Sequence, residues 1–155
     1  MPWPLLHGPF LFLYVTAMTR EKPLKWTEIL PHFIPFVLLY LLAIPFYLLS
    51  AAEKTEVFNN KGAGYEWYNL TQQAMIIIIG LGYIFWCLVR IHRHRTKIKQ
   101  WFSNTDKITL RWLEYLSIGL GIIWLLVLFF DDHIIFSGVV LLVIFIGMFG
   151  ITQLP

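Results

Sequence analysis

Histidine, cysteine and carboxylate side chains are the first candidates for chemistry in this chain, and their spacing does not favour it. His92 and His94 are two residues apart, so they would lie on different faces of a helix, and a zinc site would need two further ligands that are missing nearby. The single cysteine, Cys87, excludes a disulfide framework and every multi-cysteine metal site. The sequence offers no paired carboxylates, nucleophile–base set or phosphate-binding loop. We therefore expect no catalytic residue, no cofactor, no metal and no enzymatic activity.

Ionisable residues inside apolar segments are the second class of candidate, because burying a charge in lipid is costly. Glu114 lies about one turn inside such a segment, and Arg111 precedes it by three residues on the same helical face. We interpret the two as a local ion pair that lowers the cost of insertion. A transport site is the alternative, but transporters place charges or broken helices near the membrane midplane, and Pro45 alone is weak support for a break.

The composition defines the class of protein that holds these residues. Of 155 residues, 58% are hydrophobic, 17% aromatic and 14% charged. A water-soluble domain has roughly 45–50% apolar and about 25% charged residues. There is too little polar surface to cover a water-soluble globule, so the composition predicts an integral membrane protein. The net charge of +3 and the pI of 9.1 would suit a nucleic-acid partner, but the basic residues are better explained as topology signals.

We predict an all-α fold, a polytopic membrane helix bundle of about five transmembrane helices forming a single membrane domain over 1–155 with no soluble domain. Crossing the ~30 Å hydrocarbon layer takes about 20 mostly apolar helical residues. The expected helices cover residues 3–18, 32–52, 71–91, 110–130 and 134–151. The first is shorter and rich in proline. A cleaved signal peptide is its alternative interpretation, although no lysine or arginine precedes it.

The connecting segments carry the charge unevenly. The connections before the second and fourth predicted helices hold three and seven basic residues, against two between the second and third. Loops rich in lysine and arginine stay in the cytoplasm, so we expect an outer N-terminus and a cytoplasmic C-terminus. The residues expected to determine this topology are Arg90, Arg93, Arg95, Lys97, Lys99, Lys107 and Arg111. Anionic lipid headgroups are a candidate partner of this basic run, whereas nucleic acid is not, because no reading helix or stacking platform accompanies it.

Several segments resemble a known family. They are Gly8–Val15 (Gly-Pro-Phe-Leu-Phe-Leu-Tyr-Val), His32–Phe36 (His-Phe-Ile-Pro-Phe), Phe102–Leu113 (Phe-Ser-Asn-Thr-Asp-Lys-Ile-Thr-Leu-Arg-Trp-Leu) and Gly147–Gln153 (Gly-Met-Phe-Gly-Ile-Thr-Gln). In this order they are similar to the membrane-embedded N-terminal region of bacterial AraC-type transcriptional regulators. The resemblance covers nearly the whole chain, but its motifs carry no catalytic content. It implies a location in the bacterial cytoplasmic membrane.

The resemblance also implies an output domain. Family members carry a helix-turn-helix DNA-binding domain after the Gly-Ile-Thr-Gln segment, and usually one or two more helices before the Gly-Pro-Phe segment. We therefore expect this sequence to represent a truncated membrane domain, whose own residues contact no nucleic acid. Its glycines would allow close helix packing and self-association.

The leading hypothesis is a membrane sensory or anchoring region that relays a signal to a C-terminal DNA-binding domain. The alternative is a stand-alone small integral membrane protein with a structural or accessory role, and the membrane region of a histidine kinase is a variant of the first. The candidate signal-facing residues lie in the predicted outer segments and are Glu66, Trp67, Tyr68, Asp131 and Asp132.

Overall fold

The computed structural model describes residues 3–101 and 110–152, and every regular element in these ranges is a helix. The all-α prediction is confirmed to that extent. Lys107 and most of the Phe102–Leu113 segment lie outside the described residues, as do the side chains of Lys99 and Asp132.

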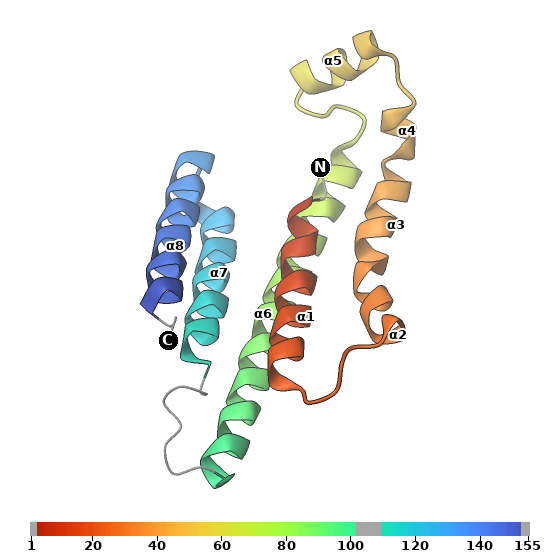
Figure 1. Cartoon of the computed structure of the whole chain (residues 1–155). Coiled ribbons are helices and arrows are strands. Elements are labelled where there is room, and N and C mark those ends of the chain that lie inside the picture. Colours follow the sequence, from red (N-terminus) through yellow and green to blue (C-terminus); the bar gives the residue numbers. More distant parts are fainter. Residues whose placement is uncertain (1–2, 102–109, 153–155) are drawn as a thin grey trace.

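A long central helix, α6 (Glu66–Trp101), organises the fold. The 3₁₀ turn η1 (Trp3–Leu6) leads into α1 (His7–Thr19), which packs along α6 in the same direction (Figure 1). On another side, α7 (Arg111–Phe129) runs antiparallel to α6 and pairs with α8 (Asp132–Thr152). The long helices therefore lie side by side, with α1 parallel and α7 antiparallel to α6.

Helix α6 is longer at both ends than the predicted segment 71–91. The basic run after Val89 was expected to be a connecting loop, but it continues the helix to Trp101. The cause is local, because arginine, lysine and glutamine favour helices and neither glycine nor proline interrupts the run. The 36 residues of α6 would extend about 54 Å at 1.5 Å per residue, well beyond a hydrocarbon layer of ~30 Å.

The predicted helix 32–52 is instead divided into short elements. These are α2 (Trp26–Ile29), η2 (Leu30–Phe33), α3 (Ile34–Leu42), α4 (Ile44–Tyr47) and the start of α5 (Ala51–Asn59). Pro45 cannot donate a backbone hydrogen bond and its ring would collide with the carbonyl of Leu41, so α3 ends just before it. Ser50 then starts α5, because its hydroxyl and the Glu53 carboxylate satisfy each other's backbone N–H groups.

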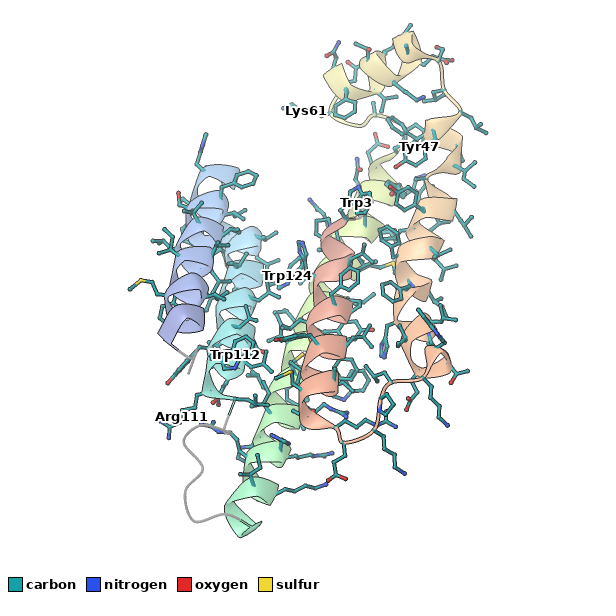
Figure 2. All side chains as sticks on the ribbon, viewed as in Figure 1. Trp3, Tyr47, Lys61, Arg111, Trp112 and Trp124 are labelled. Carbon is teal, nitrogen blue, oxygen red and sulfur yellow. The ribbon has the colours of Figure 1, made fainter. Side chains whose placement is uncertain are left out.

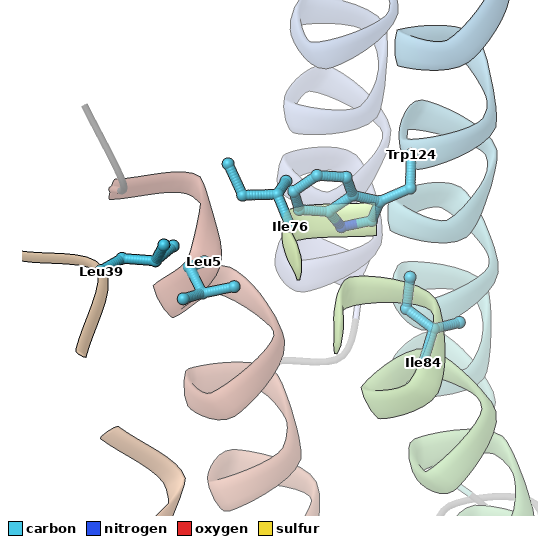
Figure 3. Close-up of a cluster of buried hydrophobic side chains, with 5 residues drawn as sticks. All are labelled: Leu5, Leu39, Ile76, Ile84 and Trp124. Atoms are coloured by element: carbon cyan, nitrogen blue, oxygen red, sulfur yellow. The ribbon is translucent and has the colours of Figure 1, made fainter. Parts of the chain in front are cut away.

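Two clusters of buried side chains hold α6 to its neighbours. The first joins Leu5, Leu39, Ile76, Ile84 and Trp124, which come from η1, α3, α6 and α7 (Figure 3). The second joins Leu11, Val15, Cys87, Ile91 and Leu113. The first cluster requires a glycine, since a Cβ at Gly80 would lie 2.9 Å from Cε2 of Trp124. Close approach of α6 and α7 therefore depends on that position.

Two helices within the described ranges are long and apolar enough to cross a membrane, Glu66–Ile98 in α6 and Arg111–Phe129. The other three predicted spans stay a prediction. The two ends of the bundle differ in chemistry: Tyr47 and Lys61 lie near one end, and Arg111 and Trp112 lie towards the other (Figure 2).

Candidate functional site

A pocket lined by aromatic rings lies where α4, α5 and the first turns of α6 meet. Its volume is about 360 Å³, which is within the range of small-molecule sites. The rings that line it are Phe46, Tyr47, Phe58, Tyr65 and Tyr68. Phe46 packs edge-on against Tyr65 with 5.6 Å between ring centroids, so α4 contacts the residue that immediately precedes α6.

A left-handed turn closes this pocket between α5 and α6. Lys61 and Gly62 have φ values of 54° and 86°, and the Gly62 N–H donates to the carbonyl of Val57 over 2.8 Å. This arrangement ends α5 and sends the chain back towards α6. A side chain at Gly62 would also collide with Asn69, since a Cβ would lie 2.5 Å from Nδ2. The pocket therefore depends on glycine at this turn.

Polar groups in the pocket are few and differ in exposure. Oε1 of Gln72 is buried and has no hydrogen-bond partner among the described residues. Asn69 and Lys61 also line the pocket, and both side chains are exposed. A buried acceptor without a partner is costly, so a ligand with a hydrogen-bond donor could satisfy Gln72 while its apolar part contacts the rings.

The five predicted signal-facing residues do not come together. Tyr68 lines the pocket, whereas Trp67 is 53% exposed. Glu66 has a structural contact, because its Oε1 accepts from the Gly64 N–H over 3.1 Å. Asp131 is exposed at the turn between α7 and α8, and its carbonyl accepts from Ile134 N–H over 3.0 Å. Asp132 has no described side chain.

Most residues of the pocket are not among those predicted from the sequence. The sequence places Phe46 and Tyr47 within the expected helix 32–52 and Phe58 in the connection after it, and Gln72 is not among the predicted signal-facing residues. The signal that could have found them is Pro45 followed by aromatic residues and a glycine-containing turn, which indicates a broken helix folding back on the next one.

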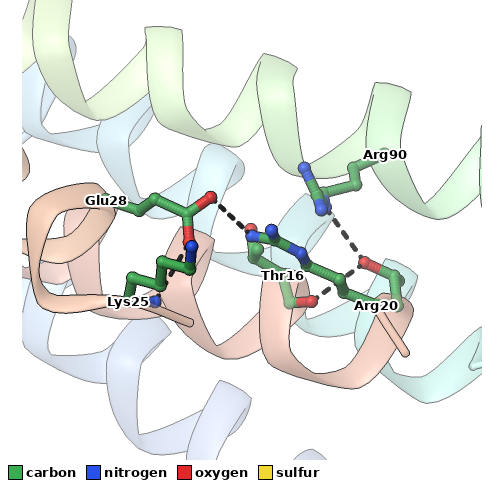
Figure 4. Close-up of polar contacts among 6 residues, drawn as sticks. Thr16, Arg20, Lys25, Glu28 and Arg90 are labelled. Atoms are coloured by element: carbon green, nitrogen blue, oxygen red, sulfur yellow. Dashed lines mark hydrogen bonds and ion pairs between the residues drawn. The ribbon is translucent and has the colours of Figure 1, made fainter. Parts of the chain in front are cut away.

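The opposite end of the bundle holds a cluster of basic side chains. Arg20 forms an ion pair with Glu28 over 2.7 Å, and Nε of Arg90 donates to Oγ1 of Thr19 over 3.0 Å (Figure 4). The Lys25 backbone N–H and the Arg20 guanidinium both bind the Glu28 carboxylate and lower its pKa below the usual value. These contacts tie the connection after α1 to α2, and the last residue of α1 to α6.

The expected ion pair between Glu114 and Arg111 is not formed. Glu114 instead pairs with Arg95, and Arg111 is exposed. The physical reason is the extension of α6, which brings Arg95 alongside the first turn of α7. Glu114 therefore links two helices rather than neutralising a charge on its own helix.

The predicted topology-determining residues that the structure describes lie at this basic end. Arg90, Arg93, Arg95 and Lys97 are on the last turns of α6, and Arg111 begins α7. The connection with Arg20 lies at the same end (Figure 1). The described basic residues of α6 and α7 and the connection after α1 thus lie at one end of the bundle.

The described part of the chain holds no group of three or more histidine, cysteine and acidic side chains that could bind a metal ion. No family model matches the chain, and neither a curated protein nor a solved structure is significantly similar to it.

Proposed function

We propose that this chain is the membrane sensory and anchoring region of a membrane-bound transcriptional regulator of the AraC type, located in the bacterial cytoplasmic membrane. The aromatic pocket is the signal site, and the basic end faces a cytoplasmic DNA-binding output. The observation that carries the proposal is the continuity of α6, whose first turns line the pocket and whose last turns carry the basic cluster.

The exposure of the apolar helices supports a membrane location. Only 33% of the apolar stretch of α6 and 17% of that of α7 is buried inside the fold. Helix α8 exposes 68% of Phe136, 68% of Leu141 and 65% of Met148. An apolar helix in water would bury these side chains, whereas lipid accepts them. In this proposal the five spans are η1 with α1, α3 with α4, then α6, α7 and α8.

The orientation follows from the charges. Short segments rich in lysine and arginine remain in the cytoplasm, so the end with Arg20 and Arg90 is cytoplasmic. The pocket then lies at the outer side, open to a small molecule from outside the cell. Its ligand would be a small ring-containing compound with a hydrogen-bond donor for Gln72.

A ligand in this pocket would contact α4, α5 and α6 together. It can shift the bundle only if it binds two arrangements of these helices with different affinity. The contact between Arg95 and Glu114 couples α6 to α7, and Leu142 of α8 packs at Gly119 of α7. A movement of α6 would thereby reach α8, which leads to the C-terminus.

The mass of the native polypeptide tests this function. An antibody against residues 53–68 should detect a membrane-bound band well above 18.3 kDa. A further domain of ~100–150 residues would bring the band to about 30 kDa or more. A band near 18 kDa would remove the transcriptional output and leave the stand-alone membrane protein as the better hypothesis.

A further inference from the structure

A second hollow lies between α1 and α6 at the basic end, with a volume of about 460 Å³. Its apolar side is formed by Phe12, Trp86 and Val89, and its basic side by Arg90, Arg93 and Lys97. We refer to these six residues as the α1–α6 groove. The signal pocket lies at the other end of α6, so the groove is a separate site.

The register of α6 builds the groove. Trp86, Arg90, Arg93 and Lys97 follow one another at steps of four, three and four residues, which places them along one face of the helix. Trp86 is 58% exposed and packs against Phe12 with ring centroids 5.8 Å apart. The tryptophan thus lies one turn before the first cation. This is the order expected where a helix leaves the hydrocarbon layer and enters the headgroup layer.

The three cations of the groove are not neutralised by the described part of the protein. The two ion pairs found there use Arg20 with Glu28 and Arg95 with Glu114. The Glu28 carboxylate at this end of the bundle is bound by Arg20 (Figure 4).

Arg90 is oriented for binding rather than free to rotate. Its Nε donates to Thr19 Oγ1 over 3.0 Å, and that hydroxyl in turn donates to the Val15 carbonyl over 2.7 Å. The guanidinium is therefore held against α1 with its two terminal amino groups available. Such a planar fork matches the oxygens of a phosphate.

We propose that the α1–α6 groove binds one anionic phospholipid, with the phosphate on Arg90, Arg93 and Lys97 and the start of the acyl chain against Phe12, Trp86 and Val89. A soluble phosphate compound shares the headgroup chemistry, but the apolar side would then contribute nothing to binding. The inference rests on the membrane location within the proposed function and is independent of signalling.

Native mass spectrometry of the purified full chain in detergent tests the groove, with phosphatidylglycerol and phosphatidylcholine as the added lipids. The chain should retain one phosphatidylglycerol and bind it at least about ten-fold more tightly than phosphatidylcholine. The double variant R93Q/K97Q should weaken phosphatidylglycerol binding about thirty-fold, because each basic residue contributes to headgroup attraction. Circular dichroism should show unchanged helix content, since both side chains are exposed.

The matched control is K22Q/R111Q, which removes two exposed charges from the same end but outside the groove. It should leave lipid binding unchanged. If both double variants lost phosphatidylglycerol binding to the same extent, general surface charge would explain the binding and the groove proposal would be wrong. Equal binding of the two lipids, or displacement of phosphatidylglycerol by an excess of inorganic phosphate, would also overturn it. If the chain inserts into membranes but binds both lipids equally, only the groove proposal is wrong. The proposed transcriptional output is tested separately, by the mass of the native polypeptide.

Discussion

At the scale of single residues, Gln72 is the side chain on which the pocket proposal depends most. Its Oε1 is buried and has no hydrogen-bond partner within residues 3–101 and 110–152, whereas the neighbouring Gln73 is exposed. A buried acceptor that lacks a hydrogen bond costs about 1–3 kcal/mol. Such a cost is offset where a ligand supplies the missing donor, so the proposed signal site predicts that Gln72 destabilises the empty protein.

We expect Gln72→Leu to raise the free energy of unfolding of the empty protein by about 1 kcal/mol, because it removes the unpartnered oxygen. The measurement is unfolding in a denaturing detergent, followed by circular dichroism. Gln73→Leu is the control on the same helix and should change the free energy of unfolding little. If Gln72→Leu instead destabilised the protein, its oxygen would have a partner and the argument for a ligand would fail.

At the scale of elements, α6 and α7 approach each other through a glycine that has a natural control two residues away. A Cβ at Gly80 would meet the Trp124 ring, whereas one at Gly82 would have no atom of the described part of the chain within 4 Å. Gly80→Ala should lower the free energy of unfolding by about 1–3 kcal/mol through overpacking. Gly82→Ala should stabilise by up to about 1 kcal/mol through helix propensity. Thermal unfolding in detergent compares the stability of the two variants. If both substitutions changed the stability equally, the close contact of Gly80 with Trp124 would be contradicted.

The connection between α1 and α2 should respond to acid. The pKa of Glu28 is lowered by the Lys25 N–H and by Arg20, so the folded form favours the charged carboxylate. Its contribution is present above the unfolded pKa and is lost as the pH falls through the lowered folded pKa. Amide hydrogen-exchange protection of residues 20–29 should therefore drop in acid. Glu28→Gln should show low protection at neutral pH as well; if it kept the pH response, another group would be responsible.

The sequence predicts the elements better than the site. Uninterrupted apolar runs predict helices near 71–91 and 110–130 because lipid and helix propensity act locally, and the structure has α6 and α7 over these residues. The pocket depends on where α4 and α5 fold back, which is set by Pro45 and by the left-handed turn at Lys61 and Gly62. That turn sets the direction in which the chain folds back towards α6, and the hydropathy pattern of the sequence does not encode this direction.

The ion-pair partner of Glu114 is a second feature that the local sequence pattern does not predict correctly. Its spacing to Arg111 predicts an ion pair within one helix, but the observed partner is Arg95. A local pattern can identify a charge that needs neutralising. Which of several arginines does so depends on how far α6 extends and how α7 packs against it, and both are tertiary properties.

At the scale of the whole molecule, the two ends of the bundle differ in their side chains. One end has the aromatic pocket with exposed Lys61, and the other gathers the basic residues of α6 and of the connection after α1. If the long helices cross a membrane, the positive-inside rule puts these ends on opposite sides. An outer signal site and a cytoplasmic output both require this orientation.

Cysteine labelling in spheroplasts tests this orientation most directly. Asn60→Cys lies in the exposed turn beside the pocket, and Lys22→Cys lies at the basic end. The native Cys87 is fully buried, so the unsubstituted chain gives the background. With a membrane-impermeant maleimide, we predict labelling of Asn60→Cys in intact spheroplasts and of Lys22→Cys only after permeabilisation. Labelling of Lys22→Cys without permeabilisation, whether or not Asn60→Cys also reacts, would contradict an outer pocket linked through α6 to a cytoplasmic end.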